Sequence, residues 1–259
     1  MKGLNLLYEV GDIMTIAVKV ENYSFAYKKI KVLKNISFQV PKGSCFGILG
    51  ANGSGKTTLI NSIIGMFPIN NEIQIFNQTP NIKDTNFKKK IGIILDNDIL
   101  IDYLSLEEYL FYIGKIYDLD DTTLQNRINK WLNYFHLEND KYRLLKFFSY
   151  GMRRKVQIIS GLLHNPDIII IDEPTNGLDV EMIYQLKKII KILKNEKVTI
   201  ILSTHYMSFA EEICDEICIL SHGYILENDS PEVLKKKYVI STLEDLYIRL
   251  LEVHIDEKK

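Results

Sequence analysis

The sequence has little cysteine, no excess of charge of either sign and no secretory signal. Its three cysteines, Cys45, Cys214 and Cys218, match neither a metal-ligand spacing nor a disulfide framework. We therefore expect reduced thiols in a cytoplasmic protein. The formal net charge of -1 leaves no electrostatic footprint for nucleic acid, so we expect no nucleic-acid partner.

Long apolar runs are also missing, although apolar content is high. A run such as Ile168–Ile171 is far shorter than the ~20 residues that cross a bilayer. Any membrane role is therefore expected to come through a partner chain. The 46% of apolar residues is enough for a sizeable core, and 259 residues allow one large domain or a core with an inserted subdomain.

One stretch, GANGSGKTT at residues 50–58, fits the phosphate-binding pattern G-x-x-x-x-G-K-[ST] without a mismatch. Its glycines let the backbone curl around phosphates, and a Cβ at Gly53 or Gly55 is expected to obstruct that curl. Lys56 is expected to be exposed until phosphate arrives and then to reach the β- and γ-phosphates, with the Thr57 hydroxyl on Mg²⁺. The predicted nucleotide ligands are Gly50, Asn52, Gly53, Ser54, Gly55, Lys56, Thr57 and Thr58.

The surroundings of this P-loop favour a nucleotide site over a simple glycine turn. Residues 45–49 predict a buried strand before the loop, and residues 58–64 predict a helix after it. The positive end of that helix then faces the phosphates. Strand, loop and helix in this order predict an α/β core that binds a nucleoside triphosphate.

Apolar patterning predicts the remaining elements. The expected strands are 16–20, 32–40, 73–76, 167–172 and 198–203, with a hairpin of 217–220 and 224–227. From about Ser105 to His164 the pattern becomes helical, as in a subdomain inserted into the core. Ser105 begins a capping box, and Thr122 and Ser208 are expected to cap further helices. Ser230-Pro231 begins a helical tail.

A P-loop enzyme needs a carboxylate at the end of a neighbouring strand, and residues 168–172 end in Asp172. Asp172 is the candidate that holds Mg²⁺ or its water. Glu173 follows at the strand tip, where it could orient and deprotonate the attacking water. Helix capping is the alternative use of Glu173, but Pro174 is expected to force an extended exit from the strand.

Three more motifs resemble the ATPase subunits of ATP-binding cassette (ABC) transporters. They are FSYGM at residues 148–152, DEPTNGLD at 172–179 and STH at 203–205, and they follow the P-loop in the family's order. The resemblance implies a mainly parallel sheet with an N-terminal antiparallel β subdomain and an inserted α-helical subdomain. It places an ABC ATPase domain at 15–228 with the insert at about 97–165, a helical tail at 229–259 and an N-terminal tail at 1–14, where Met14 is an alternative start.

The resemblance also implies roles for single residues. Ser149 and the N–H of Gly151 would hold the γ-phosphate bound to the other subunit. That anion would explain why cations stand at residues 153–155, in a first helical turn where the helix dipole disfavours positive charge. Tyr27 would stack on adenine, and the alternative is an ordinary aromatic residue on a strand. His205 would contact the γ-phosphate, and the alternative is a histidine that only ends a strand. The implied sites are catalytic Lys56, Glu173 and His205, further ATP-binding residues Tyr27, Ser149, Gly151 and Asp179, and metal ligands Thr57, Asp172 and Asp96.

Two positions depart from the family pattern. Asp96 stands where the family has a glutamine, and its carboxylate can ligate Mg²⁺ but repels the γ-phosphate when the metal is absent. The family's signature motif is L-S-G-G-Q, to which FSYGM at residues 148–152 corresponds, and Tyr150 stands in place of its first glycine. Variants of this kind resemble exporters whose membrane subunit is a separate chain.

The resemblance implies a transport-coupled ATPase that uses ATP and Mg²⁺ and works as a dimer with an identical or a different second cassette. A transmembrane permease would hold it at the cytoplasmic face of the membrane, docking near residues 96–112. Tyr103, Tyr109 and Tyr112 are candidate contacts, unless they pack within the subdomain. A soluble ABC-type ATPase that acts in cofactor assembly or another non-transport process is the alternative. A P-loop kinase is disfavoured by the motifs at residues 148–152 and 172–179.

Overall fold

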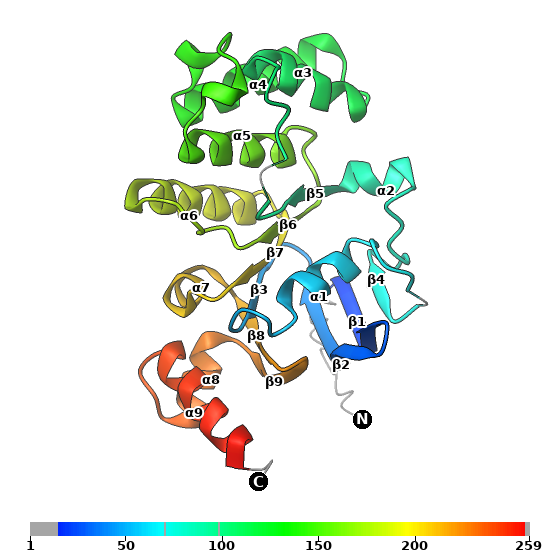
Figure 1. Ribbon diagram of the computed structural model, residues 1–259, viewed down its shortest axis with the longest axis vertical. Coiled ribbons are helices and arrows are strands. Elements are labelled where there is room, and N and C mark those ends of the chain that lie inside the picture. The colour runs from blue at the N-terminus through cyan, green and yellow to red at the C-terminus, as the bar shows by residue number, and fades with distance from the viewer. Residues whose placement is uncertain (1–14, 70, 98, 257–259) are drawn as a thin grey trace, which may run out of the picture.

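The structure, a computed structural model, describes residues 15–69, 71–97 and 99–256. The tail expected at residues 1–14 lies outside the described residues. Within them, helices cover a six-stranded sheet and a three-stranded sheet lies beside it (Figure 1). The α-helices are α1 (Lys56–Ile63), α2 (Thr85–Lys90), α3 (Leu106–Ile116), α4 (Asp121–Phe135), α5 (Tyr150–Leu162), α6 (Val180–Asn195), α7 (Met207–Ile213), α8 (Pro231–Tyr238) and α9 (Leu243–Asp256).

The six-stranded sheet has the order β5-β6-β7-β3-β8-β9 and is parallel except for the edge strand β9. Its strands are β3 (Cys45–Leu49), β5 (Ile91–Ile94), β6 (Ile168–Asp172), β7 (Thr199–Thr204), β8 (Glu216–Ser221) and β9 (Tyr224–Asp229). All residues of β3, β6 and β7 are buried, which explains their near-continuous apolar sequences. The expected hairpin is the pair of β8 and β9.

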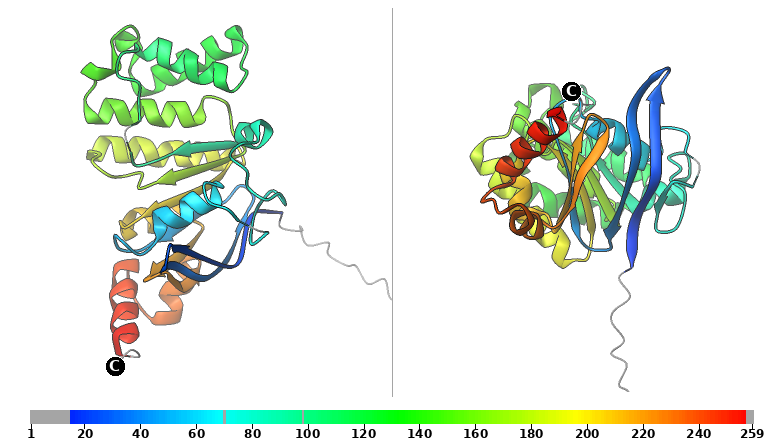
Figure 2. Two further views of the ribbon diagram at one scale, coloured as in Figure 1. Left: turned by 45° about the vertical axis from the view of Figure 1, so that its right-hand side comes forward. Right: turned by 90° about the horizontal axis from the view of Figure 1, so that it is seen from below.

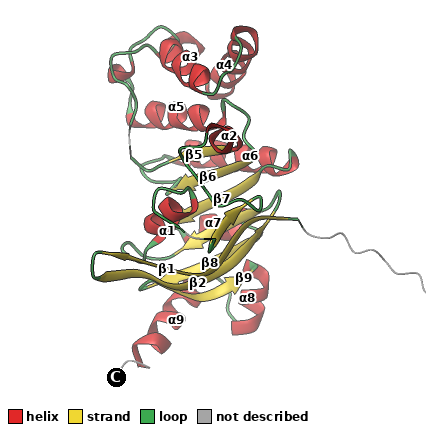
Figure 3. Cartoon of the chain, turned by 90° about the vertical axis from the view of Figure 1, so that its right-hand side faces the viewer, coloured by secondary structure: helices red, strands yellow, loops and turns green. Residues whose placement is uncertain are grey.

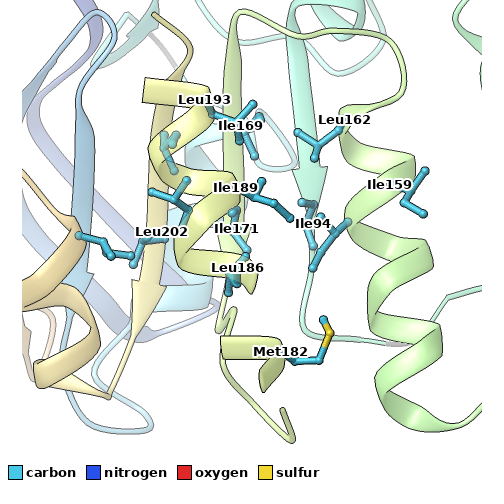
Figure 4. Packing of buried hydrophobic residues seen from close by; sticks show 14 of the residues in the cluster. Ile94, Ile159, Leu162, Ile169, Ile171, Met182, Leu186, Ile189, Leu193 and Leu202 are labelled. Carbon is cyan, nitrogen blue, oxygen red and sulfur yellow. The ribbon is translucent and has the colours of Figure 1, made fainter. Parts of the chain in front are cut away.

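Alternate residues of this sheet enter two separate cores. In β6, Ile169 and Ile171 face a core shared with α3 to α9, whereas Ile168 and Ile170 face a core shared with α1 and the smaller sheet. Figure 4 shows α6 laid along the first of these faces, with Leu186 beside the strand residues. Because both faces are covered, the carboxyl ends of the parallel strands form the accessible edge where a ligand can bind.

The smaller sheet is antiparallel, in the order β2-β1-β4, with β1 (Ile16–Tyr27), β2 (Ile30–Pro41) and β4 (Ile73–Ile75). Figure 3 shows β1 and β2 as a long curved hairpin beside the larger sheet. The expected strand at 16–20 is too short, because β1 continues to Tyr27. Register shifts between Val20 and Tyr23, where Asn22 has a φ of 51°, break the alternation that reveals a strand in the sequence.

Helices α3, α4 and α5 lie together beyond β5, with short 3₁₀ turns at η1 (Glu138–Asp140) and η2 (Leu145–Phe147) between them (Figure 2). The capping box of Ser105 with Glu108 is confirmed. The cap predicted at Thr122 is wrong, because Asp120 accepts the Thr123 N–H at 2.9 Å. Tyr109 is 5% exposed and packs mainly inside this unit, although it also lines a groove between β5, α3 and α5.

The tail folds as α8 and α9, with Ser230 capping α8 and Pro231 in its first turn, as predicted. Helix α9 lies against α7, where Glu244 accepts the Ser208 N–H at 2.8 Å. The cap predicted at Ser208 is wrong, because Ser208 lies inside α7 and Tyr206 precedes the helix. Among the described residues, no helix is long and apolar enough to cross a membrane. The domain boundaries predicted from the sequence remain predictions.

Candidate functional site

The P-loop connects β3 to α1 at the carboxyl edge of the larger sheet. Gly53 and Gly55 have φ values of 80° and 113°, which a residue with a side chain rarely adopts. A Cβ at Gly55 would lie 2.9 Å from the Leu33 side chain, whereas one at Gly53 meets nothing within 4 Å. At Gly53 the chain itself thus requires only the backbone conformation, and the obstruction of bound phosphates stays a prediction.

A cavity of about 400 Å³ opens in front of the P-loop, and we call it the P-loop face. It is lined by Tyr27, Val32, Asn52, Gly53, Gly55, Lys56, Thr57, Thr58, Asp96, Glu173 and Asn176. The cavity thus brings Asp96 and Glu173 together with seven residues predicted to bind ATP, which are Tyr27, Asn52, Gly53, Gly55, Lys56, Thr57 and Thr58. Tyr27 lies at the edge of the cavity, 46% exposed, with its ring edge-on to Phe25 and Phe67.

Lys56 is buried, so the expectation that it waits in solvent is wrong. Its side chain is 5% exposed, and Nζ lies 2.9 Å from Glu173 Oε1. Nζ also donates to the carbonyls of Gly50 at 3.0 Å and Ala51 at 3.3 Å. These carbonyls belong to its own loop. The carboxylate oxygen and these two carbonyl oxygens thus take the positions around the ammonium group where phosphate oxygens are expected to bind.

Glu173 has a left-handed backbone, with a φ of 47°, although Pro174 follows it. The extended exit predicted from that proline is therefore wrong. A non-glycine residue in this region is strained and persists only where its surroundings hold it. The Glu173 N–H donates to both the carbonyl and the hydroxyl of Ser203, each at 3.1 Å, and Glu173 Oε2 lies 2.9 Å from His205 Nδ1.

Thr57 and Asp172, two of the predicted Mg²⁺ ligands, both carry oxygen donors, but of these two only Thr57 lines the cavity. The Thr57 side chain is exposed to the cavity, and Asp172, 3% exposed, ends β6 next to Ser203 of β7, which donates to its carboxylate. Among the described residues, no group of three or more His, Cys, Asp or Glu side chains is arranged to hold a metal ion. Mg²⁺ needs no such cluster, because it usually binds through one or two carboxylates together with waters and substrate phosphates.

Asp96 and Tyr150, the two departures from the family pattern, meet at Asn176. The Asn176 side-chain amide donates to Asp96 Oδ1 at 3.2 Å, and the Tyr150 hydroxyl donates to the Asn176 carbonyl at 3.2 Å. The Tyr150 ring covers Gly177, where a Cβ would lie 2.5 Å from it. Asn176 also lines the cavity, a role that the sequence analysis missed although the residue lies within a motif it used.

Ser149, Gly151 and Asp179 lie outside the P-loop face. Ser149 caps α5 through the Met152 N–H at 3.3 Å, and Asp179 caps α6 through the Met182 N–H at 2.8 Å. Ser149 is exposed, and a Cβ at Gly151 would meet nothing within 4 Å. We call Ser149-Tyr150-Gly151 the α5 tip, and within one chain it does not meet the P-loop.

The three cations after the α5 tip have partners inside the chain, so no bound phosphate is needed to explain them. Arg153 pairs with Asp102 at 2.8 Å, and Lys155 donates to the Phe135 carbonyl at 3.1 Å. Arg154 is 2% exposed, and burial lowers the pKa of its guanidinium. The sequence analysis missed Arg154 as part of the site, because one residue in a run of cations carries no sign of burial.

The tail also reaches the P-loop. The hydroxyl of Tyr247, on α9, accepts the Ala51 N–H at 3.1 Å. The Ala51 carbonyl accepts Lys56 Nζ, so both polar groups of this residue are engaged before nucleotide binds. This contact joins residues 196 positions apart, and no sequence pattern indicates it.

Comparison with known proteins identifies the family. A family model described as ABC transporter matches residues 33–176. An uncharacterized ABC transporter ATP-binding protein of Methanocaldococcus jannaschii is 37% identical over 206 residues, 80% of this chain and 74% of that protein. The linearmycin resistance ATP-binding protein LnrL of Bacillus subtilis is 34% identical over 210 residues, 81% of this chain and 68% of that protein.

Solved structures show the same fold. The structure of an ATP binding subunit of an ABC transporter superposes with a TM-score of 0.84 at 30% identity, covering 91% of this chain and 99% of that one. A dimeric post-hydrolysis state of an ATP-binding cassette bound to ADP and Pi gives 0.74 at 26%, covering 82% and 98%. The predicted α/β P-loop fold is confirmed, and the chain belongs to the family of ABC transporter ATP-binding proteins.

Proposed function

We propose that this chain binds and hydrolyses ATP to power export of a substrate through a separate membrane permease. The observation that carries the proposal is the P-loop face. There Lys56, from the start of α1, contacts Glu173, from the end of β6, and Glu173 contacts His205, which follows β7. A cation for phosphates, a carboxylate for water and a histidine are thus gathered at one edge of the sheet.

ATP would exchange contacts with the resting site. The triphosphate draws Lys56 Nζ away from Glu173 and the loop carbonyls, and this frees one carboxylate oxygen to accept a proton. A water oxygen then forms a bond to the γ-phosphorus while the bond to the bridging oxygen of ADP breaks, and the water proton passes to Glu173. His205, held by the other carboxylate oxygen, is placed to contact the γ-phosphate.

Mg²⁺ fits the oxygen donors present, and Thr57, Asp172 and Asp96 would hold it. When bound, it neutralises charge on the phosphates. Thr57 belongs to α1 and Asp172 to β6, and Asp96 lies two residues after the end of β5. The three protein ligands are thus supplied by neighbouring segments at the same edge of the sheet.

The proposal places a second cassette over the P-loop face. The α5 tip is an exposed helix N-terminus with an exposed serine and an unobstructed glycine, which suits a phosphate bound elsewhere. A solved relative in the family is described as dimeric with ADP and Pi. Two copies related by a two-fold axis would let each α5 tip meet the nucleotide of the other chain.

Export and a separate permease are supported by a relative's name and by a surface. The relative from Bacillus subtilis is named for linearmycin resistance. Between β5, α3 and α5 lies a mainly apolar groove of about 220 Å³, bordered by Ile99 and Ile116, and Tyr103 and Tyr112 are exposed on the same helical unit. A helical segment of a permease would dock there and hold the chain at the cytoplasmic face of the membrane.

Glu173→Gln tests the function directly. It should lower ATP hydrolysis by ~10²- to 10⁴-fold with little loss of ATP affinity, because the base acts on water in the transition state. With ATP and Mg²⁺ the variant should elute as a dimer in size-exclusion chromatography, alone or with its partner cassette. Normal turnover would overturn the assignment of the base.

The transport part needs its own experiment. The purified chain should co-elute with a permease that spans the membrane, and Tyr112→Glu should abolish that complex while leaving ATP hydrolysis by the isolated chain intact. A chain that hydrolyses ATP but drives no substrate movement with any permease would favour the soluble ATPase of cofactor assembly.

A further inference from the structure

Arg154 is a buried cation whose partners are mostly main-chain oxygens. One terminal nitrogen donates to the Leu95 carbonyl at 2.7 Å and to Gln157 Oε1 at 2.9 Å. The other donates to the carbonyls of Asp172 at 3.3 Å and Glu173 at 3.2 Å. A buried charge is costly unless it is well bonded, so this side chain is fixed in place by the oxygens around it.

The carbonyls that Arg154 binds belong to the segments that carry the acidic residues of the site. Leu95 immediately precedes Asp96 at the end of β5, and the other two carbonyls are those of Asp172 and Glu173 themselves. One planar guanidinium therefore bridges the ends of two neighbouring strands. Its donor fork fixes the spacing of those strand ends as well as their distance from α5.

The Glu173 carbonyl is the point where this bridge matters most. The residue is held in the left-handed region, and its N–H is bonded to Ser203 of β7 while its carbonyl is bonded to Arg154 of α5. These two bonds fix the peptide groups on either side of the strained residue. The direction in which the carboxylate leaves the backbone therefore depends on the position of α5.

Helix α5 is packed closely on β5. A Cβ on Gly92 of β5 would lie 2.3 Å from the carbonyl of Gly161, and one on Gly161 would lie 2.6 Å from the Ile94 side chain. At Gly92 the strand thus meets the helix backbone directly, whereas at Gly161 the Ile94 side chain fills the space. A displacement of the α5 tip is transmitted along the helix to Arg154, one turn away, because the helix is rigid.

We propose that Arg154 is a positioning residue that couples the α5 tip to the Glu173 carboxylate of the same chain. This inference rests on the proposed function, in which the α5 tip meets the nucleotide of the second cassette. Contact at the tip sets the position of α5. Arg154 moves with α5 and thereby sets the position of the Glu173 carbonyl, which orients the Glu173 carboxylate toward the water at the ATP of its own chain. Each chain's base is thereby aligned by the other chain's nucleotide.

The test is a double-mutant cycle on ATP hydrolysis. Arg154→Met keeps an unbranched side chain but removes the donors, and it should lower kcat by about 10²-fold, the cost of misplacing a reacting group by ~1 Å. The affinity for ATP should remain at the wild-type value. In the Glu173→Gln background, Arg154→Met should cause no further loss, because residues that act as a unit are not additive.

Two further variants separate positioning from stability. Arg153→Met removes the neighbouring cation on the same helix, whose partner is Asp102, and kcat should be unchanged. Arg154→Lys retains the charge and one donor group, and it should recover part of the turnover lost in Arg154→Met. Melting temperature is measured for all variants, and Arg154→Lys carries the test if Arg154→Met does not fold.

The outcomes distinguish this inference from the function on which it rests. If Glu173→Gln retains normal turnover, the proposed base is wrong and the proposed function fails first. If Glu173→Gln is inactive but the losses from Glu173→Gln and Arg154→Met or Arg154→Lys multiply, the function stands and the coupling is refuted. An equal loss in Arg153→Met, or a loss of ATP affinity matching the loss of kcat, would also refute it.

Discussion

The P-loop face and the α5 tip are both expected to contact ATP, yet they are built in different ways. On the P-loop face the charged side chains already bind one another, as Lys56 binds Glu173 and Glu173 binds His205. At the α5 tip, Ser149 is exposed and Gly151 is unobstructed. The first surface must therefore break its own bonds when nucleotide arrives, whereas the second only has to meet it.

The difference implies that variants on the two surfaces have different signatures. Changes on the P-loop face alter the resting chain as well as catalysis, because they remove buried partners. Changes at Ser149 or Gly151 of the α5 tip should affect the resting chain little and act mainly when two cassettes meet. The predictions below test this contrast, beginning with the largest expected effect.

Lys56→Ala should abolish hydrolysis and also destabilise the resting chain. Removal of the ammonium leaves the buried Glu173 carboxylate without its closest cation, at a cost of about 1–3 kcal/mol in the free energy of unfolding. Phosphate release and urea unfolding measure the two effects. Adding Glu173→Gln should restore part of the stability, and the exposed Lys83 provides a Lys83→Ala control. A variant as stable as the wild type would contradict the resting ion pair.

Ser149→Arg should abolish the ATP-dependent dimer of the Glu173→Gln variant by placing a bulky side chain in the interface. ATP binding by the monomer should be unchanged, because Ser149 lies outside the P-loop face of its own chain. Loss of the helix cap should cost only ~1 kcal/mol of stability. Size-exclusion chromatography and nucleotide titration make the comparison. A dimer that persists would show that the α5 tip does not contribute to the interface.

The contacts of His164, which lies just after α5, should make the free energy of unfolding sensitive to acid. His164 donates to the Ile91 carbonyl at 3.0 Å and stacks on Tyr117, and burial lowers its pKa from 6.5 to about 4. The unfolded chain therefore binds more protons than the folded chain between these values. Stability should be complete above pH 6.5 and fall by roughly 3 kcal/mol as the pH drops to about 4.

His164→Gln provides the control for this titration, because glutamine can donate to the same carbonyl and carries no charge. The difference in unfolding free energy between wild type and variant, measured by urea titration from pH 7 to 4, should shrink or reverse with acid. An identical pH dependence in both proteins would mean that His164 is not the responsible group.

Asp96→Gln should have the smallest effect. Glutamine provides an oxygen that can accept the Asn176 amide, so the link to the α5 tip through Asn176 and Tyr150 is retained. Turnover should survive, while the Mg²⁺ concentration needed for half-maximal activity should rise because one carboxylate is gone. The measurement is ATPase activity over a Mg²⁺ titration. A collapse to the level of Glu173→Gln would make Asp96 the catalytic carboxylate.

The sequence predicted well what contiguous residues determine. The P-loop, the apolar strand that ends in Asp172 and the capping box at Ser105 are each contained within a few positions, and the structure has them as expected. The order of these motifs was enough to predict the fold class. Helix starts were less certain, as at Asp120, because neighbouring polar residues offer equally suitable caps.

Contacts between distant segments were not predictable in the same way. The burial of Lys56 depends on Glu173, which lies over a hundred positions away in the chain. The left-handed backbone of Glu173 contradicts the local preference of a residue before proline, and bonds from Ser203 and Arg154 maintain it. The tertiary structure overrides a local rule at a site of proposed chemistry, where strain is most often found.

The hydrogen bond between Tyr247 and Ala51 makes the far end of the chain a practical handle on the nucleotide site. A photocaged tyrosine incorporated at this position would remove the acceptor in the dark and restore it on illumination. Placement of a fusion tag or fluorescent reporter after α9 would attach it to a helix that touches the P-loop. The tail is thus the place from which a biosensor or a light-controlled version of this ATPase can be engineered.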